Sequence, residues 1–193
     1  MSYPATIEIN TPEEVANWRP LVQWLMAIPH LIIGGILNSI ASFLSFIAWV
    51  IILITGKMPE GIANFGCMAL RYNARANVYA GFLHTEYPPF EFETTAADPG
   101  GTPVTVNFSP ALEGRNRGTV AIRLIMLIGA YIVSLIALIV AIVAHFIAFF
   151  AVLFTGKWPT GLLAAVHKGQ SVQLRLDAYG MLLTDEFPTS QPY

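Results

Sequence analysis

The chain has 193 residues, of which 55% are hydrophobic and only 11% are charged, and its formal net charge is −2. Average soluble domains carry about 25% charged residues, so this composition indicates a membrane protein. The negative net charge and the lack of a basic stripe argue against nucleic-acid binding. The single cysteine, Cys67, excludes an intramolecular disulfide and a thiolate metal cluster.

The first predicted elements are a short strand and a long apolar segment. Ile7 and Ile9 alternate with polar residues, and this period of two predicts a strand. Residues 20–56 contain no Asp, Glu, Lys or Arg, and these 37 residues exceed the roughly 20 that one membrane span needs. They predict an apolar helical segment.

An amphipathic helix is predicted next, over residues 61–85. Apolar residues recur there at three- and four-residue spacing, with Asn and Arg side chains between them. We expect this helix to lie at the membrane interface, where the rings of Tyr72 and Tyr79 would reach headgroup depth. Packing on a β-part is the alternative. A strand near residues 90–92 would close the first repeat, residues 1–95.

The second repeat, residues 104–193, follows a linker rich in Gly and Pro at residues 96–103. Alternating apolar and polar residues at its start predict another short strand. The apolar helical segment of this repeat covers residues 121–156, and its amphipathic helix covers residues 161–184. The opening strands of the two repeats can pair with each other, and the first one can also pair with residues 90–92.

The two repeats match at a fixed offset of 100 residues. The sequence TGKMPEG begins at Thr55, and TGKWPTG begins at Thr155. The same offset pairs Arg75 with Arg175. A match of this length at constant spacing indicates a duplication, so two related halves share the function.

Two topologies fit the apolar segments. In the first, each segment folds as a helical hairpin, with a turn between Gly34 and Ser39, and all Lys and Arg residues share one side of the membrane, as the positive-inside rule favours. In the second, each segment is one long tilted or kinked helix, with Pro29 at the bend. We favour hairpins. The predicted fold class is a mainly α membrane protein, internally duplicated, with long transmembrane helices or helical hairpins, interfacial amphipathic helices and a small β-part.

Three short segments of the first repeat carry a resemblance to a known family. They are AIPH at residues 27–30, TGKMP at residues 55–59 and TEYPPF at residues 85–90. These segments resemble a bacterial membrane family known as domain of unknown function 4389, in two tandem copies. The resemblance implies a bacterial integral membrane protein, and it carries over no catalytic residue. We expect it in the bacterial inner (cytoplasmic) membrane, multi-pass or inserted as hairpins.

The sequence offers few residues with chemical potential. The Thr-Gly-Lys motif lacks the earlier glycine and the following Ser or Thr of a phosphate-binding loop. We expect Gly56 to end the apolar helix, and Lys57 and Lys157 to reach the lipid headgroups. His30 and His145 are the candidate cofactor residues, because an ionisable group in a membrane segment suggests a haem or metal ligand or a proton relay. A histidine hydrogen-bonded between helices is the alternative.

Arg75 and Arg175 occupy matching positions on the two amphipathic helices. Each is suited to binding a lipid phosphate, or to pairing with Glu86 or Glu186 and holding the helix on the β-part. We favour the pairing. No catalytic constellation, metal site or resident cofactor is predicted.

These observations predict a protein that is not an enzyme but an integral membrane scaffold, or an accessory subunit of a larger bacterial membrane complex. Its expected partners are membrane lipids, with other integral membrane subunits or a second copy of the chain. The first alternative is a lipid-binding or membrane-shaping protein. The second is a small transporter or a haem-carrying redox subunit that uses His30 and His145.

Overall fold

The computed structural model describes residues 3–190. Over this range the chain forms, in order, β1 (Ala5–Ile9), α1 (Arg19–Met26), α2 (Ile28–Thr55), α3 (Glu60–Ala80), β2 (Val104–Phe108), α4 (Arg117–Ala121), α5 (Arg123–Thr155) and α6 (Thr160–Gly180). The chain is mainly helical with a small two-stranded sheet, as the sequence predicts.

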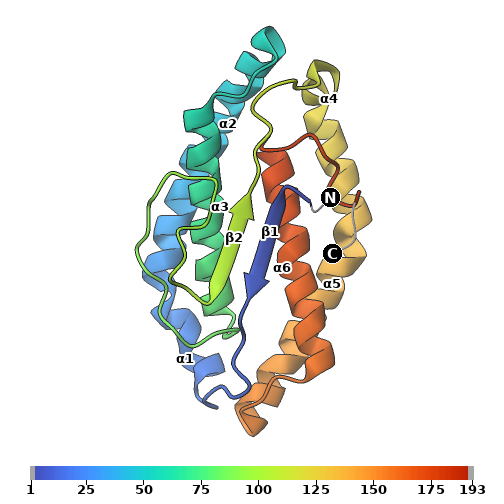
Figure 1. Cartoon of the computed structure of the whole chain (residues 1–193). Coiled ribbons are helices and arrows are strands. Elements are labelled where there is room, and N and C mark those ends of the chain that lie inside the picture. The colour runs from blue at the N-terminus through green and yellow to red at the C-terminus, as the bar shows by residue number, and fades with distance from the viewer. Residues whose placement is uncertain (1–2, 191–193) are drawn as a thin grey trace.

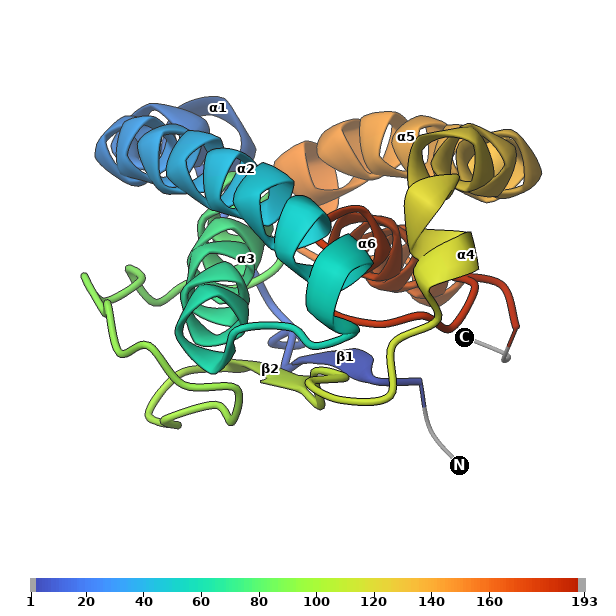
Figure 2. The ribbon, with the colours of Figure 1, turned by 90° about the horizontal axis from the view of Figure 1, so that it is seen from above.

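The elements form three layers, which are seen edge-on in Figure 2. The long helices α2 and α5 make one outer layer, α3 and α6 make the middle layer, and the strands make the other outer layer. The axes of these elements are roughly parallel, and the chain runs up along some of them and down along the others in Figure 1. In each half the long helix is therefore packed along the helix that returns beside it.

The two halves point in opposite directions, so α2 runs upward and α5 downward in Figure 1. Their internal contacts are nevertheless the same. The side-chain amide of Gln23 donates to the carbonyl of Tyr79, at 2.8 Å, and the guanidinium of Arg123 donates to the carbonyl of Tyr179, at 3.4 Å. The duplication thus extends from the sequence to the hydrogen bonds.

The β-ribbon, which we define as β1 and β2, is made of one strand from each repeat. The strands pair antiparallel with Ile7 opposite Val106, which confirms one of the two pairings expected from the sequence. Val104 and Val106 point to the middle layer and are fully buried, whereas Glu8 and Asn107 are exposed on the outer side. The ribbon therefore has one apolar face and one water-facing face.

The expected helical hairpins are wrong, because α2 and α5 are continuous helices. The small residues that suggested a turn have helical roles instead. A Cβ atom on Gly34 would lie 2.6 Å from Oδ1 of Asn73, whose Nδ2 donates to the Gly34 carbonyl at 3.0 Å. Ser39 donates to the carbonyl of Gly35 at 2.8 Å. The chain is interrupted earlier, at Ala27 between α1 and α2.

The glycines expected at the ends of the long helices are confirmed. Gly56 has a φ of 74° and Gly156 a φ of 69°, in the left-handed region. Their N–H groups donate to the carbonyls of Ile52 and Val152. A glycine adopts this conformation without the penalty that a Cβ atom brings, so each long helix ends where its matching glycine lies.

The amphipathic helices pack on the β-ribbon, which was the alternative to a position at the membrane interface. α3 and α6 occupy the middle layer, between the long helices and the β-ribbon, and they end before residues 85 and 184 because Phe82 and Leu182 adopt positive φ angles. The rings of Tyr72 and Tyr79, which were expected at headgroup depth, are buried. Those of Trp158 and Tyr179 in the second repeat are buried as well. The strand expected near residues 90–92 does not form, and residues 85–103 contain no helix or strand.

Candidate functional site

The outer surface of α1, α2 and α5 is mainly apolar. We call it the apolar face and define it by the exposed hydrophobic side chains of these helices. Among them are Ile32, Phe43, Ile54, Ile125, Ile136 and Phe154. Neither α2 nor α5 carries a charged residue except Arg123, which is buried. Both helices are long and apolar enough to cross a membrane.

The opposite surface of the molecule is polar. It consists of the outer side of the β-ribbon, where Glu8 and Asn107 are exposed, and of the loop of residues 85–103. This acidic loop carries four acidic side chains, of which Glu86 and Glu93 are exposed, and it also exposes three aromatic rings, those of Tyr87, Phe90 and Phe92. This loop crosses the middle of the molecule beside β2 and α3 in Figure 1. Polar and apolar surfaces therefore lie on the two sides of one slab, each along its length.

Arg71 fastens the acidic loop to α3. Its side chain is fully buried, and it donates to the carboxylate of Glu91 at 3.2 Å and to the carbonyls of Glu93 and Thr95 at 2.6 and 3.0 Å. A buried guanidinium is stable only when its donors are satisfied, as they are here. The sequence pattern shows Arg71 only as one polar residue among several on its helix.

Arg75, one helical turn further along α3, binds the same loop. We call these two arginines and their partners in the loop the clamp. It donates to Glu91 at 3.0 Å and to Asp98 at 2.7 Å. Its partners are therefore Glu91 and Asp98, whereas Glu86 had been expected. Arg175 is also buried, with its guanidinium carbon 4.7 Å from the centre of the Tyr3 ring. These arginines join helices to neighbouring segments of the chain.

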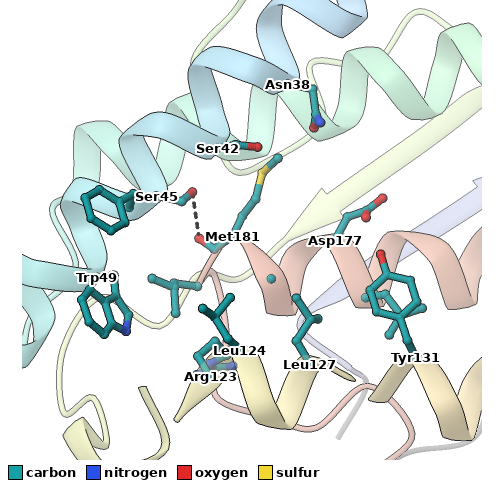
Figure 3. Close-up of a pocket in the computed structure, with 14 residues that line it drawn as sticks. Asn38, Ser42, Ser45, Trp49, Arg123, Leu124, Leu127, Tyr131, Asp177 and Met181 are labelled. Carbon is teal, nitrogen blue, oxygen red and sulfur yellow. Dashed lines mark hydrogen bonds between the residues drawn. The ribbon is translucent and has the colours of Figure 1, made fainter. Parts of the chain in front are cut away.

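A pocket opens between α2 and α5, and Figure 3 shows the side chains around it. We call it the central pocket; its volume is about 370 Å³. Apolar side chains on its walls include Phe46, Trp49 and Leu124, and the first and last of these also belong to the apolar face. Asn38 and Ser42 of α2 line it as well. The pocket is therefore amphipathic.

Two charged side chains line the central pocket. Arg123 is 2% exposed and forms an ion pair with Asp185, which also accepts from Arg115 at 2.8 Å. Among the described residues, no acceptor faces Nε of Arg123. Asp177 comes from α6 and accepts from Gln173 at 2.9 Å. Burial raises the pKa of its carboxyl group from 3.8 to about 6.

A second hollow, of about 330 Å³, adjoins the central pocket and shares Asn38 and Asp177 with it. It lies over the middle layer, between α3 and α6. Its lining is rich in side-chain amides, which are those of Asn38, Asn73, Asn77, Gln170 and Gln173. Amides offer both donors and acceptors. The middle of the apolar face is thus interrupted by a recessed polar floor.

The two histidines expected as cofactor ligands have different surroundings. Nδ1 of His30 lies 2.7 Å from the hydroxyl of Tyr72, and its ring stacks on that of Phe90, with centroids 4.3 Å apart. His145 packs against the rings of Phe82 and Trp158. Within residues 3–190, no three His, Cys, Asp or Glu side chains are grouped to hold a metal ion.

The two lysines of the repeated motif are exposed and reach across to the other repeat. Lys57 pairs with Glu113 at 2.9 Å, and Lys157 pairs with Glu14 at 3.2 Å. Exposed pairs of this kind are worth only about 0–1 kcal/mol. They mark the two ends of the slab, where each long helix turns into the next element.

The residues of the central pocket were not singled out from the sequence. A signal was present, because a position-by-position comparison of the repeats shows Ser42 matching Ile142 and Ser45 matching His145. Small polar residues in one copy and large ones in the other indicate a space that only one half leaves open. A fixed offset of 100 residues makes this comparison possible.

Comparison with known proteins places the chain in one family. The sequence profile described as "Domain of unknown function (DUF4389)" matches residues 17–91 and residues 117–190. These ranges are the two repeats without their opening strands. Neither the curated proteins nor the solved structures gave a match.

Proposed function

The chain belongs to the DUF4389 family, whose description names no activity, and we propose from the geometry that it is a non-catalytic, lipid-binding membrane protein. In this proposal the molecule lies flat in one leaflet. The apolar face enters the lipid, and the β-ribbon and the acidic loop stay in water.

The position of the polar surface is the observation that carries this proposal. The β-ribbon lies beside the middle of the long helices, not beyond their ends (Figure 1). If α2 and α5 stood along the membrane normal, Glu8, Asn107 and the outer edge of β1 would lie in hydrocarbon. Unpaired backbone groups cost several kcal/mol each there, and open sheet edges do not occur facing lipid. An orientation parallel to the membrane avoids this cost.

The lengths of the helices support the same orientation. At a rise of about 1.5 Å per residue, the 28 residues of α2 extend about 42 Å and the 33 residues of α5 about 50 Å. The hydrocarbon core of a bilayer is only about 30 Å thick. Helices that lie in the plane of one leaflet have no such limit, and their apolar side enters the leaflet by about 5–10 Å.

Depth measurements with spin labels test the proposal. In a Cys67→Ala background, single cysteines replace Ile32, Phe43 and Ile54, which are all exposed on α2 and spaced by 11 residues, close to three helical turns. The outer two positions are about 33 Å apart along the axis. In vesicles of phosphatidylglycerol and phosphatidylethanolamine, we expect equal, shallow depths at all three positions.

A spanning orientation gives a different pattern, in which Phe43 would be deep and both ends shallow. The matched set on α5 is Ile125, Ile136 and Ile147, and it should repeat the result of α2. A label in place of Glu8, on the outer side of the ribbon, is the control and should be fully accessible to water-soluble relaxation agents. A deep minimum at the middle positions would overturn the proposal.

A scaffold or accessory subunit is the second candidate, and one feature of α2 favours it. Gly35 and Ser39 are exposed small residues four positions apart, and a Cβ atom on Gly35 would meet nothing within 4 Å. Small residues at this spacing let another membrane helix approach closely. Purification of a tagged chain in mild detergent, followed by mass spectrometry, separates the two candidates. A stoichiometric larger subunit supports the scaffold, and a lone chain with enriched lipid supports lipid binding.

A further inference from the structure

The two repeats fill matching positions in different ways. On α5, His145 packs against Phe82 and Trp158, and its Cε1 atom would lie 2.9 Å from a Cβ atom on Gly81. On α2 the matching residue is Ser45, whose hydroxyl donates to the carbonyl of Met181 at 3.4 Å. In the second repeat, the imidazole of His145 and the rings beside it fill the space next to the long helix. In the first repeat, the small hydroxyl of Ser45 leaves the matching space open, and this space is the central pocket.

The size of the central pocket suits one chain-like ligand. Its volume of about 370 Å³ is at the small end of the roughly 300–1,000 Å³ found for ligand sites. Phe46, Trp49, Leu124 and Leu127 give it apolar walls on both long helices, as Figure 3 shows for the last three. Because the pocket opens within the apolar face, a ligand reaches it from the lipid rather than from water.

The polar groups of the pocket limit the headgroup. Asp177 and Arg123 contribute one acidic and one basic group, so the lining has no net charge. The guanidinium of Arg123 is already engaged, because it donates to Asp185 and to the carbonyls of Tyr179 and Thr184. Asn38, Ser42 and the amides of the adjoining hollow suit hydroxyl groups.

We infer that the central pocket binds a single-chain glycerolipid with an uncharged, hydroxylated headgroup, of the monoacylglycerol type. The acyl chain lies between α2 and α5, and the glycerol hydroxyls face Asp177 and the amides. This inference rests on the proposed lipid-facing orientation and names the ligand of the same face. An anionic single-chain lipid would bring a charge that Asp177 opposes, because the positive charge of Arg123 is already paired with Asp185.

Quenching of tryptophan fluorescence tests the inference. The probe is monoolein brominated at its double bond, added to the purified full-length chain in a non-ionic detergent. Because bromine quenches only at short range, a chain in the pocket quenches Trp49. We expect a saturable component that disappears in Trp49→Phe. The exposed Trp18 and Trp24 contribute only a non-saturating background.

Two variants on α2 separate the pocket from the rest of the apolar face. Ser42→Ile introduces the residue of the second repeat and fills the pocket; we expect at least tenfold weaker binding of the probe. Ser39→Ile makes the same chemical change one turn away, outside the lining of the pocket, and should bind as the wild type does. Equal effects of the two variants, or no saturable quenching in the wild type, would overturn the inference.

Two further measurements complete the test. Brominated oleic acid and brominated lysophosphatidylglycerol carry the same chain with an anionic head, and we expect each to bind at least tenfold more weakly than monoolein. Equal or tighter binding would refute the uncharged headgroup. Flotation with vesicles should be unchanged in Ser42→Ile, since the apolar face remains. If the wild type floats but does not bind the probe, the pocket inference fails while the proposed orientation survives.

Discussion

Replacing Asp177 with Asn should stabilise the chain, and the gain should grow with pH. Asn is the residue that the first repeat carries at the matching position, Asn77, so the fold accepts it. Burial raises the pKa of Asp177 from 3.8 to about 6, which corresponds to about 3 kcal/mol of free energy favouring the protonated carboxyl in the folded chain. The substitution removes the cost of ionising a carboxylate in this recess.

The sign follows from proton linkage. A raised folded-state pKa means that the folded chain holds the proton more tightly than the unfolded chain, so this group's contribution to stability is complete below about pH 4 and is lost as the pH rises through about 6. Asp177→Asn should therefore match the wild type near pH 4 and exceed it by about 3 kcal/mol at pH 8, with roughly half of the gain present at pH 5.

Guanidinium unfolding in a non-ionic detergent, followed by tryptophan fluorescence at several pH values, measures this difference. Comparison of variant and wild type at each pH cancels the other titrating groups. Glu8→Gln, an exposed site on the β-ribbon, controls for the loss of one negative charge. A variant that is equally stable at all pH values, or most favoured in acid, would show that Asp177 ionises at no cost and would refute the reasoning.

Four further substitutions test the packing with the same unfolding assay. Asp185→Asn should lower the free energy of unfolding by roughly 3–5 kcal/mol, because two buried guanidiniums lose their shared carboxylate. Gly169→Ala should cost about 1–3 kcal/mol, since its Cβ atom would lie 2.3 Å from that of Ala141 on α5. Gly129→Ala, with open space around it, should instead gain up to about 1 kcal/mol. Lys57→Ala should change stability by less than about 1 kcal/mol, because its ion pair is exposed.

Local signals in the sequence predicted the elements of the fold well. The offset of 100 residues located both repeats, and Gly56 and Gly156 marked the ends of the long helices because the left-handed cap is a property of glycine itself. The alternation at residues 7–9 and 104–108 predicted both strands. Each of these features depends on interactions within a few residues or on the exact repeat.

The relation between elements was not predictable in the same way. Gly34 and Asn73 interact across 39 residues, and only that contact explains why a glycine pair stays helical. Arg71 binds Glu91 and backbone carbonyls in a loop that has no periodic sequence pattern. These contacts could therefore not be predicted from the sequence. Amphipathicity predicted that α3 would have two different faces, but not that another layer would cover each of them.

The candidate site was recoverable only in part. Ionisable residues inside apolar segments drew attention to His30 and His145, yet both pack among aromatic rings. The pocket depends on what is missing, namely the bulk that Ser45 lacks relative to His145. An absent side chain gives no signal in a single sequence unless a second copy shows what could have stood there.

The antiparallel arrangement of the repeats explains why one broad side of the molecule is apolar and the opposite side is polar. Each repeat alone stacks a long apolar helix, a returning helix and one strand, and a lone strand cannot satisfy its backbone hydrogen bonds. Opposed directions let β1 and β2 pair across the middle and bring α2 and α5 to the same outer side (Figure 2). The pairing of the strands thus fixes the apolar face opposite the water-facing one, and it leaves a seam between α2 and α5. One copy closes its side of that seam with His145, and the other, with Ser45, leaves the central pocket open.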